Sequence, residues 1–190
     1  LFDTADIYGF GEQGFGKAEE LLGRVFAEAP EYRDRMVLAT KGGITPPTPY
    51  DSSAEYLTKA IDDSLSRLGT EYVDLWQIHR PDILTHPQEI ARTIEDAHKA
   101  GKIRAFGVSN FTTAQITTLA QFSSVPIVST QPELSPLRID TIENGELDQA
   151  IAMDLAVLAW SPLGGGRIGD PGDAREQNVA TALSGVAAAH

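Results

Sequence analysis

The 190-residue sequence contains no cysteine, which excludes a disulfide framework, thiol catalysis and thiolate metal sites. Positive charge is also scarce, since 15 Lys and Arg stand against 27 Asp and Glu for a formal net charge of -12. Nucleic acids and anionic membranes bind basic surfaces, so the composition argues against both as partners. No apolar run approaches the roughly 20 residues that cross a membrane, and the first residues lack the pattern of a signal peptide. A soluble, cytoplasmic protein is expected.

The two ends of the chain also lack the features with which domains usually begin and end. The sequence opens on Leu1 inside a strand-like apolar run and closes on His190 within an Ala-rich helical pattern. Natural domains usually end in a polar tail or a helix stop. We therefore interpret residues 1–190 as a single domain truncated at both ends.

Short apolar runs alternate with longer amphipathic segments along the whole chain. Runs rich in Val, Ile, Leu and Ala predict six strands, at residues 1–3, 36–41, 73–79, 103–110, 127–131 and 155–161. The segments between them predict helices. Strand and helix in regular alternation indicate a parallel sheet covered by helices, either doubly wound or closed into a barrel.

The predicted helices have recognisable ends and apolar stripes. Ser52 or Ser53 begins one helix, Gly101 ends the next, and Thr112 with Gln115 matches a capping box. The apolar residues expected to face the core are Leu21, Leu22, Val25, Phe26, Leu57, Ile61, Leu65, Leu68, Ile90, Ile94, Ala97, Leu147, Ile151, Val179, Leu183 and Val186.

Polar residues at the strand ends distinguish the two candidate folds. A doubly wound sheet concentrates its chemistry in one crevice, whereas a barrel collects it from the ends of most strands around one mouth. All six predicted strands end at or beside a polar residue, and these are Asp3, Lys41, His79, Asn110, Gln131 and Ser161. The pattern favours an α/β fold of the TIM-barrel type with about six β/α units.

A glycine-rich run at residues 9–14 matches the GxGxxG spacing of a dinucleotide-binding loop. In a Rossmann fold an apolar strand leads directly into the first glycine, whereas Asp3, Asp6 and Tyr8 intervene here. The acidic residue expected about 20 positions later falls in a polar stretch and not at the end of a second strand. A flexible loop is therefore favoured over a Rossmann site.

Asp3, Tyr8, Lys41 and His79 form a set suited to carbonyl reduction, although each alone has an ordinary structural explanation. A phenol is a weak acid at neutral pH unless a nearby cation stabilises its phenolate, and Lys41 can be that cation. Asp3 on the neighbouring strand offers the counter-charge that a buried ammonium requires. His79 can donate a hydrogen bond to an oxygen that acquires charge. Together they can protonate a carbonyl oxygen while a hydride reaches its carbon.

Six ordered blocks of the sequence resemble the aldo-keto reductases, and these are FDTADIYG, VLATKGG, DLWQIHRPD, FGVSNF, QPELSPL and AWSPLGGG. The resemblance runs from Leu1 to about Arg167 and is nearest to a bacterial branch of predicted oxidoreductases. It implies a (β/α)8 TIM barrel of which this chain has the second to seventh strands and lacks the first and eighth.

The resemblance implies an oxidoreductase that uses NADP to reduce a small aldehyde or ketone, without a metal. The catalytic residues would be Asp3, Tyr8, Lys41 and His79: Tyr8 is the general acid, Lys41 stabilises its phenolate, Asp3 pairs with Lys41, and His79 orients the carbonyl. The implied cofactor-binding residues are Asp3, Ser109, Asn110, Gln131, Trp160, Ser161, Pro162, Leu163 and Gly165. The preference for NADPH over NADH stays open, because the family's 2′-phosphate segment is not among these blocks, and the sequence does not reveal the oligomeric state.

Three alternatives follow from the same residues. Potassium-channel β subunits share the fold and motifs, so the first alternative is a cofactor-binding regulatory subunit. The second alternative is a Schiff-base lyase or aldolase that uses Lys41, and it is disfavoured. Such a lysine must lose its proton, whereas the negative charge of a neighbouring Asp3 would keep Lys41 protonated. The third alternative is an inert fragment, since a barrel without two strands has two open edges. The sequence predicts that the 190 residues alone bind NADPH weakly or not at all.

Overall fold

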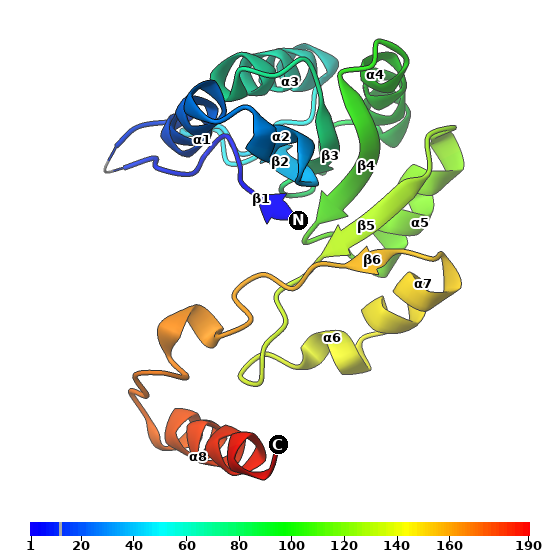
Figure 1. Cartoon of the computed structure of the whole chain (residues 1–190). Helices are drawn as coiled ribbons and strands as arrows, with labels where there is room; N and C mark the ends of the chain where they lie inside the picture. Colours follow the sequence, from blue (N-terminus) through cyan, green and yellow to red (C-terminus); the bar gives the residue numbers. More distant parts are fainter. Residues whose placement is uncertain (12) are drawn as a thin grey trace. The chain divides into compact units, whose positions relative to one another are not determined.

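The structure is a computed structural model of the chain and describes residues 1–11 and 13–190. The chain separates into two compact units, Leu1–Thr130 and Gln131–His190, and each is described by itself. Strands and helices alternate along the chain, as Figure 1 shows.

The first unit holds most of the regular structure. Its elements are β1 (Phe2–Asp3), α1 (Lys17–Glu28), α2 (Glu31–Asp34), β2 (Leu38–Gly42), α3 (Ala54–Leu68), β3 (Val73–Ile78), α4 (Pro87–Lys99), β4 (Ile103–Ser109) and α5 (Thr113–Phe122). Strand β5 (Ile127–Gln131) reaches the division between the units. The second unit contains α6 (Asp140–Glu143), α7 (Glu146–Ala152), β6 (Ala156–Val157), a 3-10 turn (Gly164–Gly166) and α8 (Ala174–Ala189).

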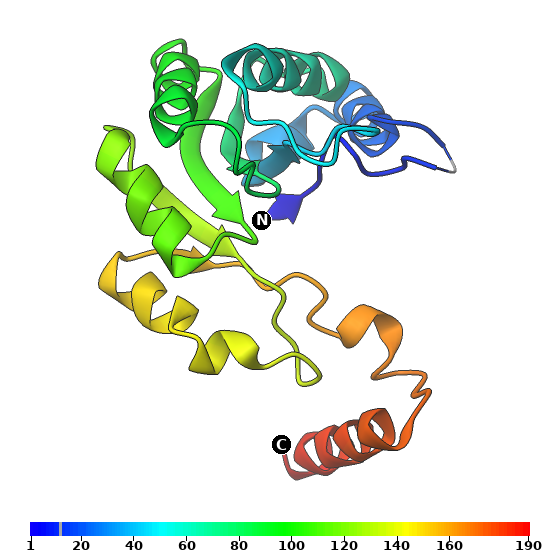
Figure 2. The ribbon, with the colours of Figure 1, turned by 180° about the vertical axis from the view of Figure 1, so that it is seen from behind.

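The strands follow one another in the sheet in chain order, from β1 to β6. The pairs β1–β2, β2–β3 and β3–β4 are parallel, and Lys41, Gln77 and Gly107 are partners in one register across β2, β3 and β4. Helices α3, α4 and α5 run along one face of these strands, as the reverse view shows (Figure 2). The predicted incomplete barrel of six β/α units is confirmed, and the Rossmann alternative is wrong.

Local sequence explains where the helices begin. The hydroxyl of Ser53 accepts a hydrogen bond from the Tyr56 backbone, so the N-cap of α3 is Ser53 and not Ser52. Thr112 and Gln115 form the predicted capping box of α5. Helix α4 ends at Lys99 and is followed by Gly101 with φ 76°, a conformation that favours glycine.

Several residues predicted to face the core do not. In α1 the buried side consists of Glu19, Leu22 and Phe26, while Leu21 and Val25 are exposed. The sequence offers apolar residues on two adjacent sides of α1, and periodicity alone does not tell which of them faces the core. The other predicted core residues found exposed are Ile151, Leu183 and Val186.

The last predicted strand is shorter than expected. Only Ala156–Val157 forms β6, whereas the prediction covered residues 155–161. Trp160 instead makes an isolated parallel bridge to Glu133, and its backbone N–H donates to the Pro132 carbonyl at 3.0 Å. Pro162 then follows and has no N–H with which to extend a ladder.

The described residues of the glycine-rich run, 9–11 and 13–14, lie outside any helix or strand, in agreement with the predicted loop. Gly9, Gly11 and Gly14 have φ values of 98°, 103° and 111°, which residues other than glycine rarely adopt. Glu12, the fourth residue of this GxGxxG run, lies outside the described residues.

Candidate active site

Lys41 and Asp3 are hydrogen-bonded at the carboxyl ends of β2 and β1. The Lys41 side chain is fully buried, and its Nζ donates to Asp3 Oδ2 at 2.6 Å and to the Thr4 carbonyl at 2.9 Å. Because β1 and β2 are parallel neighbours, these strand ends lie side by side. The ammonium thus has both a counter-charge and a neutral acceptor, which offset the cost of its burial.

The rings of Tyr8 and His79 meet next to this ion pair. Lys41 Nζ lies 5.1 Å from the centroid of the Tyr8 ring, within the range of a cation–π interaction. The Tyr8 and His79 ring centroids are 5.8 Å apart and their planes cross at 81°, an edge-to-face contact. The Tyr8 residue is 39% exposed, so a phenol beside a buried cation remains accessible.

His79 is neutral at neutral pH. Burial, with Lys41 and Arg80 nearby, lowers its pKa to about 3. Its Nδ1 is buried and has no hydrogen-bond partner among the described residues. A neutral imidazole has one N–H donor and one acceptor nitrogen, so His79 can donate to a ligand without carrying charge.

Asn110 lies beside His79 and has a left-handed backbone with φ 60°. Its Nδ2 donates to the His79 carbonyl at 3.1 Å and to Ser109 Oγ at 2.8 Å. The two bonds fix the orientation of the amide at the end of β4. The structure therefore brings together the predicted site residues of the first unit, which are Asp3, Tyr8, Lys41, His79, Ser109 and Asn110.

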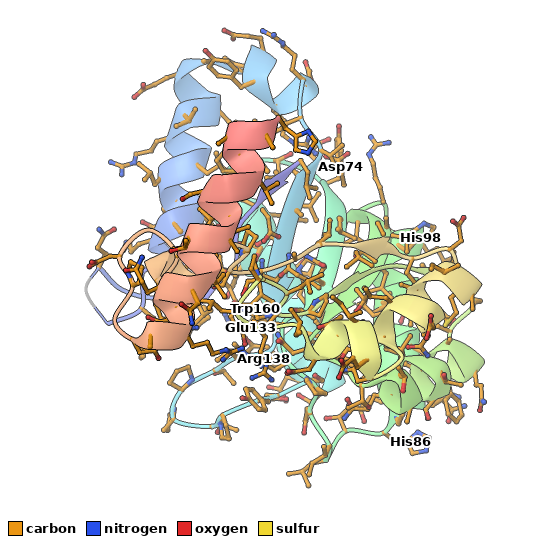
Figure 3. The ribbon with its side chains drawn as sticks, turned by 90° about the horizontal axis from the view of Figure 1, so that it is seen from below. Asp74, His86, His98, Glu133, Arg138 and Trp160 are labelled. Carbon is orange, nitrogen blue, oxygen red and sulfur yellow. The ribbon has the colours of Figure 1, made fainter. Side chains whose placement is uncertain are left out.

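The other predicted cofactor residues belong to the second unit. Gln131 is buried at the end of β5, and Trp160 lies close to Glu133 and Arg138 in Figure 3. In the loop after Trp160, Ser161 has φ 47°, Leu163 is exposed and Gly165 has φ 66°. Apart from Gly165 and its two chain neighbours, no atom of the described residues lies within 4 Å of the position that a Cβ of Gly165 would occupy. The backbone at Gly165 is therefore open to a close contact.

A second buried polar cluster lies on the helix-covered face of the same strands. Asp6 is almost fully buried, accepts a hydrogen bond from the Tyr56 hydroxyl at 3.1 Å, and donates its backbone N–H to the Lys41 carbonyl at 3.0 Å. Burial and the nearby Glu19 raise the pKa of Asp6 to about 7. Burial and Asp6 likewise raise the pKa of Tyr56. Glu19 itself accepts from Thr40 Oγ1 at 2.5 Å and from Arg67 Nε at 2.7 Å.

Sequence reasoning missed this cluster and also missed Gln77, a buried residue that contacts Asp3. Nε2 of Gln77 lies 3.4 Å from Asp3 Oδ1. The available indication was a polar residue between Trp76 and Ile78, inside an otherwise apolar strand end. No group of three or more His, Cys, Asp or Glu within residues 1–11 and 13–190 is placed to hold a metal ion.

The sequence of this chain matches a known protein family. The model of the Aldo/keto reductase family matches residues 1–181. The chain belongs to this family. It is 63% identical over its whole length to 6-dehydroglucose reductase of Novosphingobium aromaticivorans, and the match covers 62% of that protein. It is 37% identical to 6-dehydroglucose reductase of Agrobacterium fabrum, over 87% of this chain and 57% of that protein.

Solved structures of aldo-keto reductases show the same fold. The glycerol dehydrogenase AKR11B4 from Gluconobacter oxydans has a TM-score of 0.77 and 34% identity, and the match covers 90% of this chain and 52% of that chain. The thermostable aldo-keto reductase Tm1743 has a TM-score of 0.76 and 28% identity, over 86% of this chain and 55% of that chain. The chain thus spans about six-tenths of the length of the curated relatives it matches.

The expectation of an oxidoreductase family is confirmed. Aldo-keto reductases act on small carbonyl compounds and generally use a nicotinamide cofactor. Across the described part of the chain, none of the helices combines the length and apolar character needed to cross a membrane.

Proposed function

We propose that the protein containing this chain is an NADP-dependent reductase of aldehydes or ketones, with Tyr8 as the general acid. The observation that supports this most strongly is the Lys41 ammonium, bonded to Asp3 and 5.1 Å from the Tyr8 ring, with neutral His79 against that same ring. A cation stabilises the phenolate that remains after proton transfer, so the phenol can donate at neutral pH.

Each residue of this group has one task in the proposed reaction. Tyr8 donates its phenolic proton to the carbonyl oxygen of the substrate. His79 donates an N–H to the same oxygen and orients it, because its imidazole is neutral and one nitrogen is protonated. Asp3 holds Lys41 in place. The nicotinamide dinucleotide, when bound, supplies the hydride.

The residues proposed to hold the cofactor fit a carboxamide and a pyrophosphate. Ser109, Asn110 and Gln131 offer amide and hydroxyl groups at strand ends, and hydrogen bonds to Asn110 already fix its amide. Trp160 offers an aromatic face for the nicotinamide. The remaining proposed contacts are Asp3, Ser161, Pro162, Leu163 and Gly165. Open space around Gly165 suits close approach of a phosphate to the backbone.

We further propose an aldehyde derived from a hexose as the substrate. Relatives of this chain at 63% and 37% identity are named 6-dehydroglucose reductase. We also propose a cytoplasmic location, because reduced NADP is available there. That residues 1–190 form a single domain stays a prediction.

The test is the Tyr8→Phe variant of the full-length protein, assayed for NADPH oxidation with 6-dehydroglucose. The variant should lose about 100-fold or more in kcat, as expected for removal of a general acid, while NADPH binding measured by fluorescence stays unchanged. Tyr32→Phe, at an exposed position on α2, is the matched control and should keep full activity. Undiminished reduction by Tyr8→Phe would refute the role of Tyr8.

The same assay addresses the alternatives. A regulatory subunit would bind NADPH without turning over any carbonyl compound. If residues 1–190 are inert on their own, the full-length protein would be active, and the 190 residues alone would not bind NADPH.

A further inference from the structure

Gln77 is a fully buried amide in the strand layer that holds Lys41. It lies in β3, pairs in register with Lys41 of β2 and Gly107 of β4, and is flanked in sequence by the fully buried Trp76 and Ile78. Burial of an amide without hydrogen-bond partners costs free energy, so the Gln77 amide is expected to have such partners.

The two ends of the Gln77 amide contact different strands. Nε2 donates to Asp3 Oδ1 at 3.4 Å, and Oε1 accepts from Ser129 Oγ at 3.4 Å. A carboxylate only accepts hydrogen bonds, so the NH2 end must face Asp3. The Ser129 hydroxyl, on β5 and 1% exposed, then fixes the other end of the amide.

Gly107 makes this contact possible. Strand β4 separates β3 from β5, and a Cβ on Gly107 would lie 2.0 Å from Ser129 Oγ and 3.3 Å from Gln77 Cγ. Any side chain at this position would occupy the space through which Ser129 reaches Gln77. Three strands therefore contribute to one arrangement, with a glycine in the middle.

We propose that Gln77, oriented by Ser129, is a positioning residue that fixes the rotation of the Asp3 carboxylate. Asp3 has one oxygen on Gln77 and the other on Lys41. Its side chain is 28% exposed, so surrounding atoms do not restrict its rotation on every side. With Gln77 in place, Oδ2 faces Lys41, and Lys41 stays beside the Tyr8 ring. This inference rests on the proposed function, because its consequence is measured as carbonyl reduction.

The experiment uses Gln77→Met in the full-length protein, which keeps the length of the side chain and removes both hydrogen bonds. We expect kcat for NADPH-dependent reduction to fall about tenfold, the factor that one hydrogen bond to a charged group is worth. KM and the Kd for NADPH should stay within about twofold, since Gln77 is proposed to act through Asp3. Ser129→Ala should lower kcat by about threefold, because it removes only the group that orients the amide.

Gln77→Glu supplies a readout that a purely structural role would not move. A glutamic acid can donate to Asp3 only while it is protonated, so its kcat relative to the parent should rise as the pH is lowered. Gln77→Met should show no such pH dependence relative to the parent. Thr93→Val, at a buried position on α4 whose hydroxyl bonds a helix carbonyl, is the matched control and should leave kcat unchanged.

The outcomes separate this inference from the proposed function. A parent protein that reduces no carbonyl compound overturns both. An active parent with undiminished kcat in Gln77→Met overturns the inference alone. If Gln77→Met does not fold, Ser129→Ala and the pH profile of Gln77→Glu decide, and normal kcat in the first with a parent-like profile in the second overturns the inference.

Discussion

Acidic residues next to the two faces of β2 have opposite surroundings. Successive residues of a strand point to opposite faces, so Lys41 bonds Asp3 on one side while Thr40 bonds Glu19 on the other. Asp3 and Asp6 are only three residues apart. Asp3 is paired with a buried cation, whereas Asp6 has a phenol as its partner and a second carboxylate nearby. The same residue type thus serves an ion pair on the interior face and a proton-retaining cluster on the helix-covered face.

The largest effect is expected from breaking the interior face at its cation. Lys41→Met keeps the volume of the side chain and removes the charge that faces Asp3 and Tyr8. We expect kcat to fall by about 1000-fold in the full-length protein, since Tyr8 then loses the charge that stabilises its phenolate. Lys59→Met, on the exposed surface of α3, is the control and should keep the parent kcat. A Lys41→Met enzyme within tenfold of the parent would contradict the proposed role.

Asp6, on the helix-covered face, should make the stability of the protein depend on pH. The pKa of Asp6 is raised from 3.8 to about 7, so between these values the folded protein keeps a proton that the unfolded chain releases. Stability from this group is therefore lost as the pH rises from about 4 to 7. The pKa of His79 is lowered from 6.5 to about 3, so the unfolded chain binds a proton that the folded protein does not, and this group adds stability as the pH rises from about 3 to 6.5. In the parent the two contributions oppose each other between about pH 4 and 6.5.

Asp6→Asn separates the two contributions. Asparagine does not titrate and its amide oxygen can still accept from Tyr56. Relative to the parent, the free energy of unfolding of Asp6→Asn should rise between pH 4 and 7 by on the order of 3 kcal/mol. Urea denaturation at several pH values measures this difference, with Asp148→Asn on the surface of α7 as a control. A constant difference between variant and parent would show that Asp6 does not retain its proton.

The comparison of the two faces also shows what the sequence can predict. Asp3, Lys41 and His79 could be grouped because parallel strands bring their carboxyl ends together, whatever the detailed register. The contacts of Gln77 with Ser129, 52 positions apart, depend on cross-strand register and on the space left by Gly107. The Asp6–Tyr56 contact, 50 positions apart, depends on how α3 packs on the sheet. The alternation of strands and helices, and the polar residues at the strand ends, are encoded in the local sequence. Strand register and helix packing are set by tertiary structure.

The smallest effect is expected at Gly107, which lies on β4 between Gln77 and Ser129. A Cβ at this position would lie 2.0 Å from Ser129 Oγ, so Gly107→Ala should destabilise the protein by about 2 kcal/mol through overpacking. Ser129→Ala removes the clashing oxygen, and the double variant should be less destabilised than the sum of the two single variants. The carbonyl oxygen of Ser129, 3.1 Å from the added Cβ, should leave part of the cost in place. Urea denaturation of the four proteins closes the cycle. Strict additivity would mean that β4 shifts to accommodate the methyl group, and the space at Gly107 would then not be what allows Ser129 to reach Gln77.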